Sequence, residues 1–215
     1  MTAAASHAVR PGDAAPGFTL PAIHRDGSVS LADYRDRSPL MLAIFRGLYC
    51  PFCRRGIAQF GAAREKLRAQ GVEALAVVAS DLERARLYFK YRPAAVPLLA
   101  DPGLVTHRAY GLPQTPIDEK VVAMAADAKI NPTGELPGPT PLLEAVTILN
   151  RKDGYPDSEP DSREWAHQGA LFCGQFLVDA SGTVRWSQIE ASEGPSGFGK
   201  FPSESDLMVA TRALA

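Results

Sequence analysis

The chain has 215 residues, a formal net charge of −1, a hydrophobic share of 46% and three cysteines. The near balance of charge disfavours broad electrostatic capture of nucleic acid or of an anionic membrane surface, and the length suits one domain or two small ones. Three cysteines cannot build the disulfide framework of a small secreted protein, whereas this hydrophobic share can form a core without such cross-links.

The amino-terminal segment lacks an apolar run of the length that a signal peptide needs, because prolines and a glycine interrupt it before Phe18. The most apolar short stretch, LMLAIF at 40–45, has the length of a strand and is far too short to cross a membrane. We therefore expect no membrane segment and, by default, a reducing cytoplasmic location.

Apolar periodicity and turn residues predict an alternation of strands and helices. The predicted elements are, in chain order, strands at 18–20, 29–31 and 40–45, a helix at about 51–70, a strand at 72–79, a helix at 82–91, a strand at 97–100, a helix at about 103–110, a hairpin of strands at 176–178 and 183–186, and a last helix from the capping box of Ser203 and Asp206 to about 213. This order predicts an α/β sandwich whose sheet has a parallel centre and helices on both faces.

A proline-rich acidic segment at about 112–170 separates the late hairpin from the earlier elements, and it holds eight of the chain's 18 prolines. Two helical patterns lie inside it, at 117–129 and 141–151. The second is expected to have Thr140 as its N-cap and Pro141 at its first helical position. We interpret the segment as an insertion on a single domain that spans residues 1–215.

The most informative segment is a C-x-x-C motif, Cys50 to Cys53, which directly follows the buried strand and begins a helix. Cys50 is expected at the N-cap, with Pro51 at the first helical position, where its missing N–H costs nothing. Free N–H groups and the helix dipole then favour the thiolate, so we expect the pKa of Cys50 to lie below its ordinary value of about 8.5. Arg46 and Arg54, four residues away on either side, could add positive charge.

The two thiols are expected to differ in exposure. Five residues recur at helical spacing and should pack on the sheet: Cys53, Ile57, Phe60, Ala63 and Leu67. This predicts a buried Cys53 and an accessible Cys50 at the helix tip, an arrangement that suits dithiol–disulfide chemistry. Inert core cysteines, or two ligands of a metal site, remain alternatives on this evidence.

Several segments resemble the thioredoxin superfamily and, more closely, its peroxiredoxin-like branch, the alkyl hydroperoxide reductase/thiol-specific antioxidant group. They are the C-x-x-C segment at 45–55, Ser80-Asp81 before a helix, VPLLADP at 96–102, AYGL at 109–112, and FLVD with SGTV at 176–184. The likeness covers roughly 15–111 and 172–186. It implies a thioredoxin-like three-layer sandwich with a mixed central sheet, in which Cys50 is the peroxidatic or attacking thiol and Cys53 is the resolving one.

The chain departs from the pattern of this family in two places, at the motif before Cys50 and near the start of the late hairpin. The motif Pro-x-x-x-Thr-x-x-Cys has Ala43 and Gly47 at its proline and threonine positions. The family's arginine, or the cis-proline of thioredoxins, aligns near Cys173. We hypothesise that Arg46 replaces the lost cation. Cys173 is either a small buried apolar residue or a second resolving thiol that approaches Cys50.

Other signals are weaker. The segment at 194–200 nearly matches a phosphate-binding loop, but Phe201 stands where serine or threonine is needed, which favours a flexible surface loop. Trp165 and Phe172 either line a groove over the thiols or belong to the core, and core is the commoner role of such residues.

These observations predict a thiol-dependent antioxidant oxidoreductase that reduces peroxides or disulfides through a Cys50/Cys53 cycle. The expected reductant is an external dithiol, thioredoxin- or glutathione-like, and no bound cofactor or metal, nucleic acid or membrane partner is expected. The alternative is a thioredoxin-fold binding or metal-holding protein without turnover. In that case Cys50, Cys53, Cys173 and His167 could form a zinc tetrad. Apolar clusters in the insertion either cover the sheet or form a homodimer face.

Overall fold

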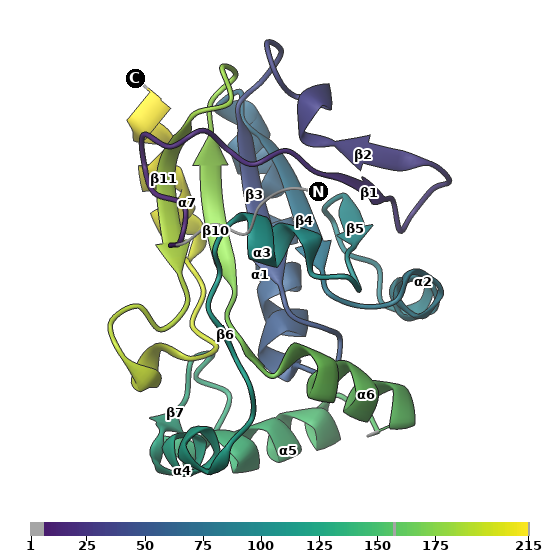
Figure 1. Cartoon of the computed structure of the whole chain (residues 1–215), viewed down its shortest axis with the longest axis vertical. Helices are drawn as coiled ribbons and strands as arrows, with labels where there is room; N and C mark the ends of the chain where they lie inside the picture. The colour runs from purple at the N-terminus through teal and green to yellow at the C-terminus, as the bar shows by residue number, and fades with distance from the viewer. Residues whose placement is uncertain (1–6, 157, 215) are drawn as a thin grey trace.

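The computed structural model of the chain describes residues 7–156 and 158–214. Its centre is a sheet of five strands in the order β11-β10-β3-β4-β5 (Figure 1). The strands are β3 (Leu40–Phe45), β4 (Glu73–Val78), β5 (Leu98–Ala100), β10 (Gly174–Val178) and β11 (Val184–Ile189). Strands β3, β4 and β5 run parallel, whereas β10 is antiparallel to both β3 and β11. The central sheet is therefore mixed, as predicted.

Successive residues of β3 point into two hydrophobic cores, one on each face of the sheet. Leu42 and Ile44 belong to one core, and Met41 and Phe45 belong to the other. The second core is completed by helices α1 (Pro51–Ala69), α2 (Leu82–Tyr91) and α7 (Glu204–Ala210), and the first by helix α3 (Val105–Ala109) with the hairpin of β1 (Thr19–Pro21) and β2 (Ser28–Ser30). Figure 1 shows α3 in front of the sheet and α1 behind it. The three-layer α/β sandwich with helices on both faces is confirmed.

Helix α1 carries the C-x-x-C motif, and its sequence explains where it begins and ends. Cys50 is the N-cap and Pro51 follows within the first turn, as predicted. The five residues of the predicted buried stripe are each at most 2% exposed. After the C-cap, Gly71 has a φ of 75°, a left-handed conformation that glycine adopts without strain and that ends the helix.

The segment at 112–170 forms three helices and two short ladders. The helices are α4 (Glu119–Asp127), α5 (Leu142–Lys152) and α6 (Glu159–Gln168), and the ladders pair β6 (Gln114–Thr115) with β9 (Ala170–Leu171) and β7 (Lys129–Ile130) with β8 (Thr140–Pro141). Figure 1 shows the three helices together at the lower end of the molecule, beyond the carboxyl ends of β3 and β4. This segment, for which we keep the name insertion, thus lies at the end of the sheet where α1 begins.

Helices α4 and α5 correspond to the two predicted helices. The start of α5 differs from the prediction, and α6 is not among the predicted helices. Pro141, and not Thr140, is the N-cap of α5. Both residues are extended because they pair with β7, so the helix begins after them. The sequence does not predict α6 because EPDSREWAHQ has little apolar periodicity. Polar contacts hold it instead, since Asp161 accepts hydrogen bonds from Arg84 and from the Tyr155 hydroxyl.

Within residues 7–156 and 158–214, none of the helices combines the length and the apolar character needed to cross a membrane.

The buried stripe of α1 gives a prediction about stability. Leu67→Ala is expected to lower the free energy of unfolding by about 2–5 kcal/mol, because the leucine is fully buried and a cavity would remain. Lys66→Ala, on the exposed side of the same turn, breaks only a surface ion pair with Glu204 and should cost about 1 kcal/mol or less. Urea unfolding of both variants measures the difference, and equal losses would contradict the assignment of the buried face.

Candidate active site

Cys50 lies where β3 has ended and α1 begins, and two N–H donors point at its sulfur. The backbone N–H of Cys53 donates to Cys50 Sγ at 3.3 Å, and Arg46 Nη2 donates to the same sulfur at 3.5 Å. The first contact arises because an N-cap side chain accepts from the free N–H groups of the first turn. The second brings a full positive charge to the thiol, as the sequence suggested for Arg46.

Arg46 is held in place from several sides. Its Nη1 donates to Glu190 Oε2 at 2.5 Å and to the Leu171 carbonyl at 2.7 Å, and its Nη2 donates to Glu190 Oε1 at 2.9 Å. The guanidinium also lies 4.3 Å from the centre of the Phe198 ring. Arg46 and Glu190 form a buried, bidentate ion pair, since their side chains are 3% and 0% exposed.

Glu190 joins three segments that are far apart in the sequence. Besides binding Arg46, its carboxylate accepts the backbone N–H of Cys173 at 3.0 Å and that of Gly199 at 2.6 Å. Sequence patterns do not single out Glu190, because it follows β11 and lies outside the segments that resemble a known family. Its role in the geometry is to fix Arg46, the start of β10 and the loop after β11 relative to one another.

The segment at 194–200, expected to be a flexible surface loop, is only partly at the surface. Phe198 packs edge-on against both Phe52 and Phe172 and lies over Arg46. Gly199 is buried, and a β-carbon there would meet the Phe52 ring at 2.7 Å. The carboxyl-terminal part of this loop therefore closes over the site.

The prediction that Cys50 is accessible is wrong. Its side chain lies in the same buried cluster as Phe52 and Cys53, and the residue is only 5% exposed. The tip of a helix is usually open, but here the loop after β11 and the insertion both return to this end of the sheet. Cys53, at 1% exposed, is buried as predicted.

The expected low pKa of Cys50 is also wrong for this closed arrangement. Burial, and then the neighbouring Cys53 side chain, raise the pKa of the Cys50 thiol well above its ordinary value, although Arg46 acts in the opposite direction. Burial raises the pKa of Cys53 as well. In the closed, reduced site the Cys50 and Cys53 thiols are therefore neutral. The N–H donors that would stabilise a negative charge on Cys50 are already in place.

Cys173 contacts Cys53, whereas the sequence hypothesis placed it near Cys50. The sulfurs of Cys53 and Cys173 are 3.7 Å apart, and Cys173 is 1% exposed just before β10. The zinc tetrad is not formed, because within the described ranges no group of three or more histidine, cysteine or acidic side chains is arranged to hold a metal ion. His167, its proposed fourth member, is exposed on α6.

Helix α6 of the insertion shapes the loop that leads to Cys50. Gln168 accepts hydrogen bonds from the Gly47 N–H at 3.1 Å and the Tyr49 hydroxyl at 3.0 Å, and its amide donates to the Ala79 carbonyl. A β-carbon at Gly47 would come within 2.6 Å of Glu164 Oε2. A side chain at the position of the family's threonine would therefore require the Glu164 carboxylate and the Tyr49 ring to shift.

The remaining candidates are Arg54, Trp165 and Phe172. Arg54 turns toward the insertion, where it donates to Asn150 and Asp153 and also to the Leu48 carbonyl. Trp165 is 44% exposed and so is not a core residue. Phe172 is partly buried and packs against Phe198.

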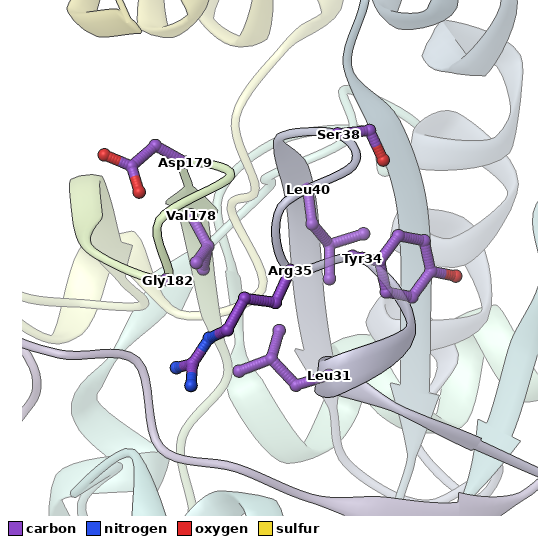
Figure 2. Close-up of a pocket in the computed structure, with 8 residues that line it drawn as sticks. All are labelled: Leu31, Tyr34, Arg35, Ser38, Leu40, Val178, Asp179 and Gly182. Atoms are coloured by element: carbon purple, nitrogen blue, oxygen red, sulfur yellow. The ribbon is translucent and has the colours of Figure 1, made fainter.

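Figure 2 shows a small pocket that is lined by Leu31, Tyr34, Arg35, Ser38, Leu40, Val178, Asp179 and Gly182. It lies where β3 begins and β10 ends, which is the end of the sheet opposite the C-x-x-C motif. A second hollow lies beside Cys173 and Glu190, between β10 and residues 200–202. The first pocket therefore has no part in the cysteine site.

A model of the AhpC/TSA family matches residues 11–138, which is more than half of the chain. The chain belongs to the AhpC/TSA family. This membership supports a thiol-dependent redox function, of peroxidase or thiol–disulfide oxidoreductase type. A comparison with curated proteins found no match.

Solved structures show the same fold at low sequence identity. The peroxidoxin BcpB of Mycobacterium tuberculosis is 12% identical, with a TM-score of 0.57 and 96% of each chain covered. The reduced 2-Cys peroxiredoxin of Plasmodium vivax is 12% identical, with a TM-score of 0.60 and 96% of each chain covered. A candidate thiol:disulfide interchange protein, DsbE, of Chlorobium tepidum is 18% identical, with a TM-score of 0.51, 95% of this chain and 99% of that chain covered. The peroxiredoxin-like member of the thioredoxin superfamily expected from the sequence is thus confirmed.

The contact between Arg46 and Cys50 predicts a change in acidity. Arg46→Ala is expected to raise the pKa of the Cys50 thiol further, because the guanidinium charge lowers it. Arg46→Lys keeps a charge and should shift the pKa less. The pH dependence of alkylation by iodoacetamide measures both values, and an unchanged pKa in folded Arg46→Ala protein would remove Arg46 from this role.

The Glu190 carboxylate should shift the pKa of Cys50 in the direction opposite to Arg46. Glu190→Gln is expected to lower the pKa of Cys50, because the carboxylate charge raises it. The same variant should lose about 3–5 kcal/mol of stability, since Arg46 would remain buried without its charged partner. Glu193→Gln, on the exposed part of the same loop, should change stability by about 0.5 kcal/mol or less. A rise in the Cys50 pKa of Glu190→Gln would contradict this account.

Proposed function

We propose that this chain is a thiol-dependent peroxidase that reduces small hydroperoxides through Cys50, with Cys53 as the resolving thiol. The observation that carries the proposal is the pair of donors, the Cys53 N–H and Arg46 Nη2, directed at Cys50 Sγ. Both stabilise negative charge on this sulfur, and the thiolate is the form of cysteine that attacks peroxides. Membership of the AhpC/TSA family supports the same chemistry.

In the first step, the Cys50 thiolate attacks one peroxide oxygen and the O–O bond breaks. The other oxygen leaves with the electron pair and takes a proton, as water or an alcohol, and Cys50 becomes a sulfenic acid. In the second step, the Cys53 sulfur attacks this sulfenic acid, a disulfide forms and water leaves. An external dithiol, thioredoxin- or glutathione-like, then reduces the disulfide and is itself oxidised.

The burial of Cys50 favours a small substrate. At 5% exposure, its sulfur can be reached by a hydroperoxide more readily than by the disulfide of another protein. Because Gly47 offers no hydroxyl, the orientation of the peroxide rests on Arg46. Reduction of disulfides is the second candidate, favoured by the C-x-x-C spacing at a helix N-terminus.

Stopped-flow kinetics test the proposal. Reduced wild-type protein should consume hydrogen peroxide, Cys50→Ser should not, and Cys53→Ser should complete one turnover and stop as a sulfenic acid. A small disulfide substrate, measured with the same variants, distinguishes the second candidate. If neither substrate is turned over in a Cys50-dependent manner, the chain is a binding protein, and stoichiometric zinc in the purified protein would point to metal holding.

The acidity of Cys50 adds a pH dependence to this test. The thiolate is the reactive form, and burial holds the pKa of Cys50 above its ordinary value. The rate constant of peroxide consumption should therefore rise continuously from neutral to alkaline pH. A rate that is already at its plateau at neutral pH would contradict the closed form as the reacting species.

We further propose a reducing compartment such as the cytoplasm, where thioredoxin- and glutathione-type donors keep thiols reduced. A homodimer is proposed through the insertion, which presents half-exposed apolar side chains on its helices. These are Val122, Met124, Leu143, Ile148 and Trp165. Sedimentation equilibrium of wild-type protein tests this association.

A further inference from the structure

Cys53 lies in contact with both of the other cysteines. Its backbone N–H donates to Cys50 Sγ at 3.3 Å, and its own sulfur is 3.7 Å from that of Cys173. A disulfide bond is about 2.05 Å long, so the Cys53 and Cys173 sulfurs need to approach by only about 1.7 Å to bond. The middle cysteine therefore has two partners within reach, on different elements.

We propose that the Cys50–Cys53 disulfide is exchanged for a Cys53–Cys173 disulfide, which returns Cys50 to its free thiol form. This inference rests on the proposed function, since the Cys50–Cys53 disulfide is its starting point. It assigns Cys173 as a further catalytic thiol of the same site.

The step is a thiol–disulfide exchange without net oxidation. The Cys173 thiol loses its proton and its sulfur attacks Cys53 Sγ of the Cys50–Cys53 disulfide. The Cys53–Cys173 bond forms while the Cys50–Cys53 bond breaks. Cys50 leaves with the electron pair and takes up a proton. No reagent beyond the peroxide of the first step is required.

Hydrogen-bond donors stand at the sulfur that leaves. In such an exchange, the sulfur that best carries negative charge is the better leaving group. The two N–H donors of the cluster, from Cys53 and Arg46, both point at Cys50 Sγ. The negative charge that develops on the leaving Cys50 sulfur is therefore stabilised by donors that are already in place.

The attacking thiol is also held in position. The Cys173 N–H donates to Glu190, and the Glu190 N–H donates to the Cys173 carbonyl at 3.0 Å. Glu190 binds Arg46 as well, so one carboxylate fixes both the entering thiol and the cation at the leaving thiol. Cys173 also lines the small hollow beside residues 200–202.

Peptide mapping tests the transfer directly. Trypsin cleaves after arginine, so Cys50 and Cys53 share the peptide 47–54, whereas Cys173 lies in the peptide 164–185. Reduced wild-type protein is treated with one equivalent of hydrogen peroxide, blocked with N-ethylmaleimide and mapped without reduction. The expected product is a cross-link between the two peptides with the label on Cys50. Cys173→Ser protein should lose the cross-link and stop at Cys50–Cys53.

Two results separate this inference from the proposed function. A lasting Cys50–Cys53 disulfide with labelled Cys173 in wild-type protein would overturn the transfer and leave peroxide reduction intact. Cys50→Ser protein, equilibrated with oxidised dithiothreitol instead of peroxide, should still form the cross-link between 47–54 and 164–185. Its failure to do so, while wild-type protein forms a disulfide in the same buffer, would overturn the pairing of Cys53 with Cys173 even if peroxide turnover were absent.

Discussion

The buried ion pair between Arg46 and Glu190 is the interaction on which the rest of the site depends. Removing two charges from water is costly, and only close two-pronged geometry with further hydrogen bonds compensates for it. Here the further bonds come from the backbones of Cys173 and Gly199. The same contacts that make the pair tolerable also bring a cation to Cys50, the Cys173 thiol to Cys53 and a covering loop over the site. The same hydrogen bonds thus stabilise the buried ion pair and position the groups around the thiols.

Two segments outside the core sandwich complete the surroundings of the thiols. Helix α6 reaches in through Gln168 and fixes the turn that precedes Cys50. The loop after β11 brings Phe198 over Arg46. Both segments exclude water, and this explains why burial outweighs the helix terminus in setting the acidity of Cys50.

Local sequence patterns predict the sandwich, the buried stripe of α1 and the place of Cys50 at its N-cap, because these depend on residues close together in the chain. They do not predict the burial of Cys50, the approach of Cys173 to Cys53, or the role of Glu190. Each of these depends on contacts between segments distant in sequence, such as the one between residues 46 and 190. Helix α6 escapes prediction for a related reason, since polar contacts through Asp161 replace an apolar stripe.

Gly47 links the loop before Cys50 to helix α6. A β-carbon at position 47 would meet Glu164 Oε2 of α6 and the Tyr49 ring, so a side chain there would require both to shift. The same Glu164 oxygen accepts a hydrogen bond from the Ser80 hydroxyl, while Gln168 of the same helix accepts from the Gly47 N–H. A larger residue at position 47 would therefore act beyond its own loop, because displacing Glu164 would also disturb its contact with Ser80.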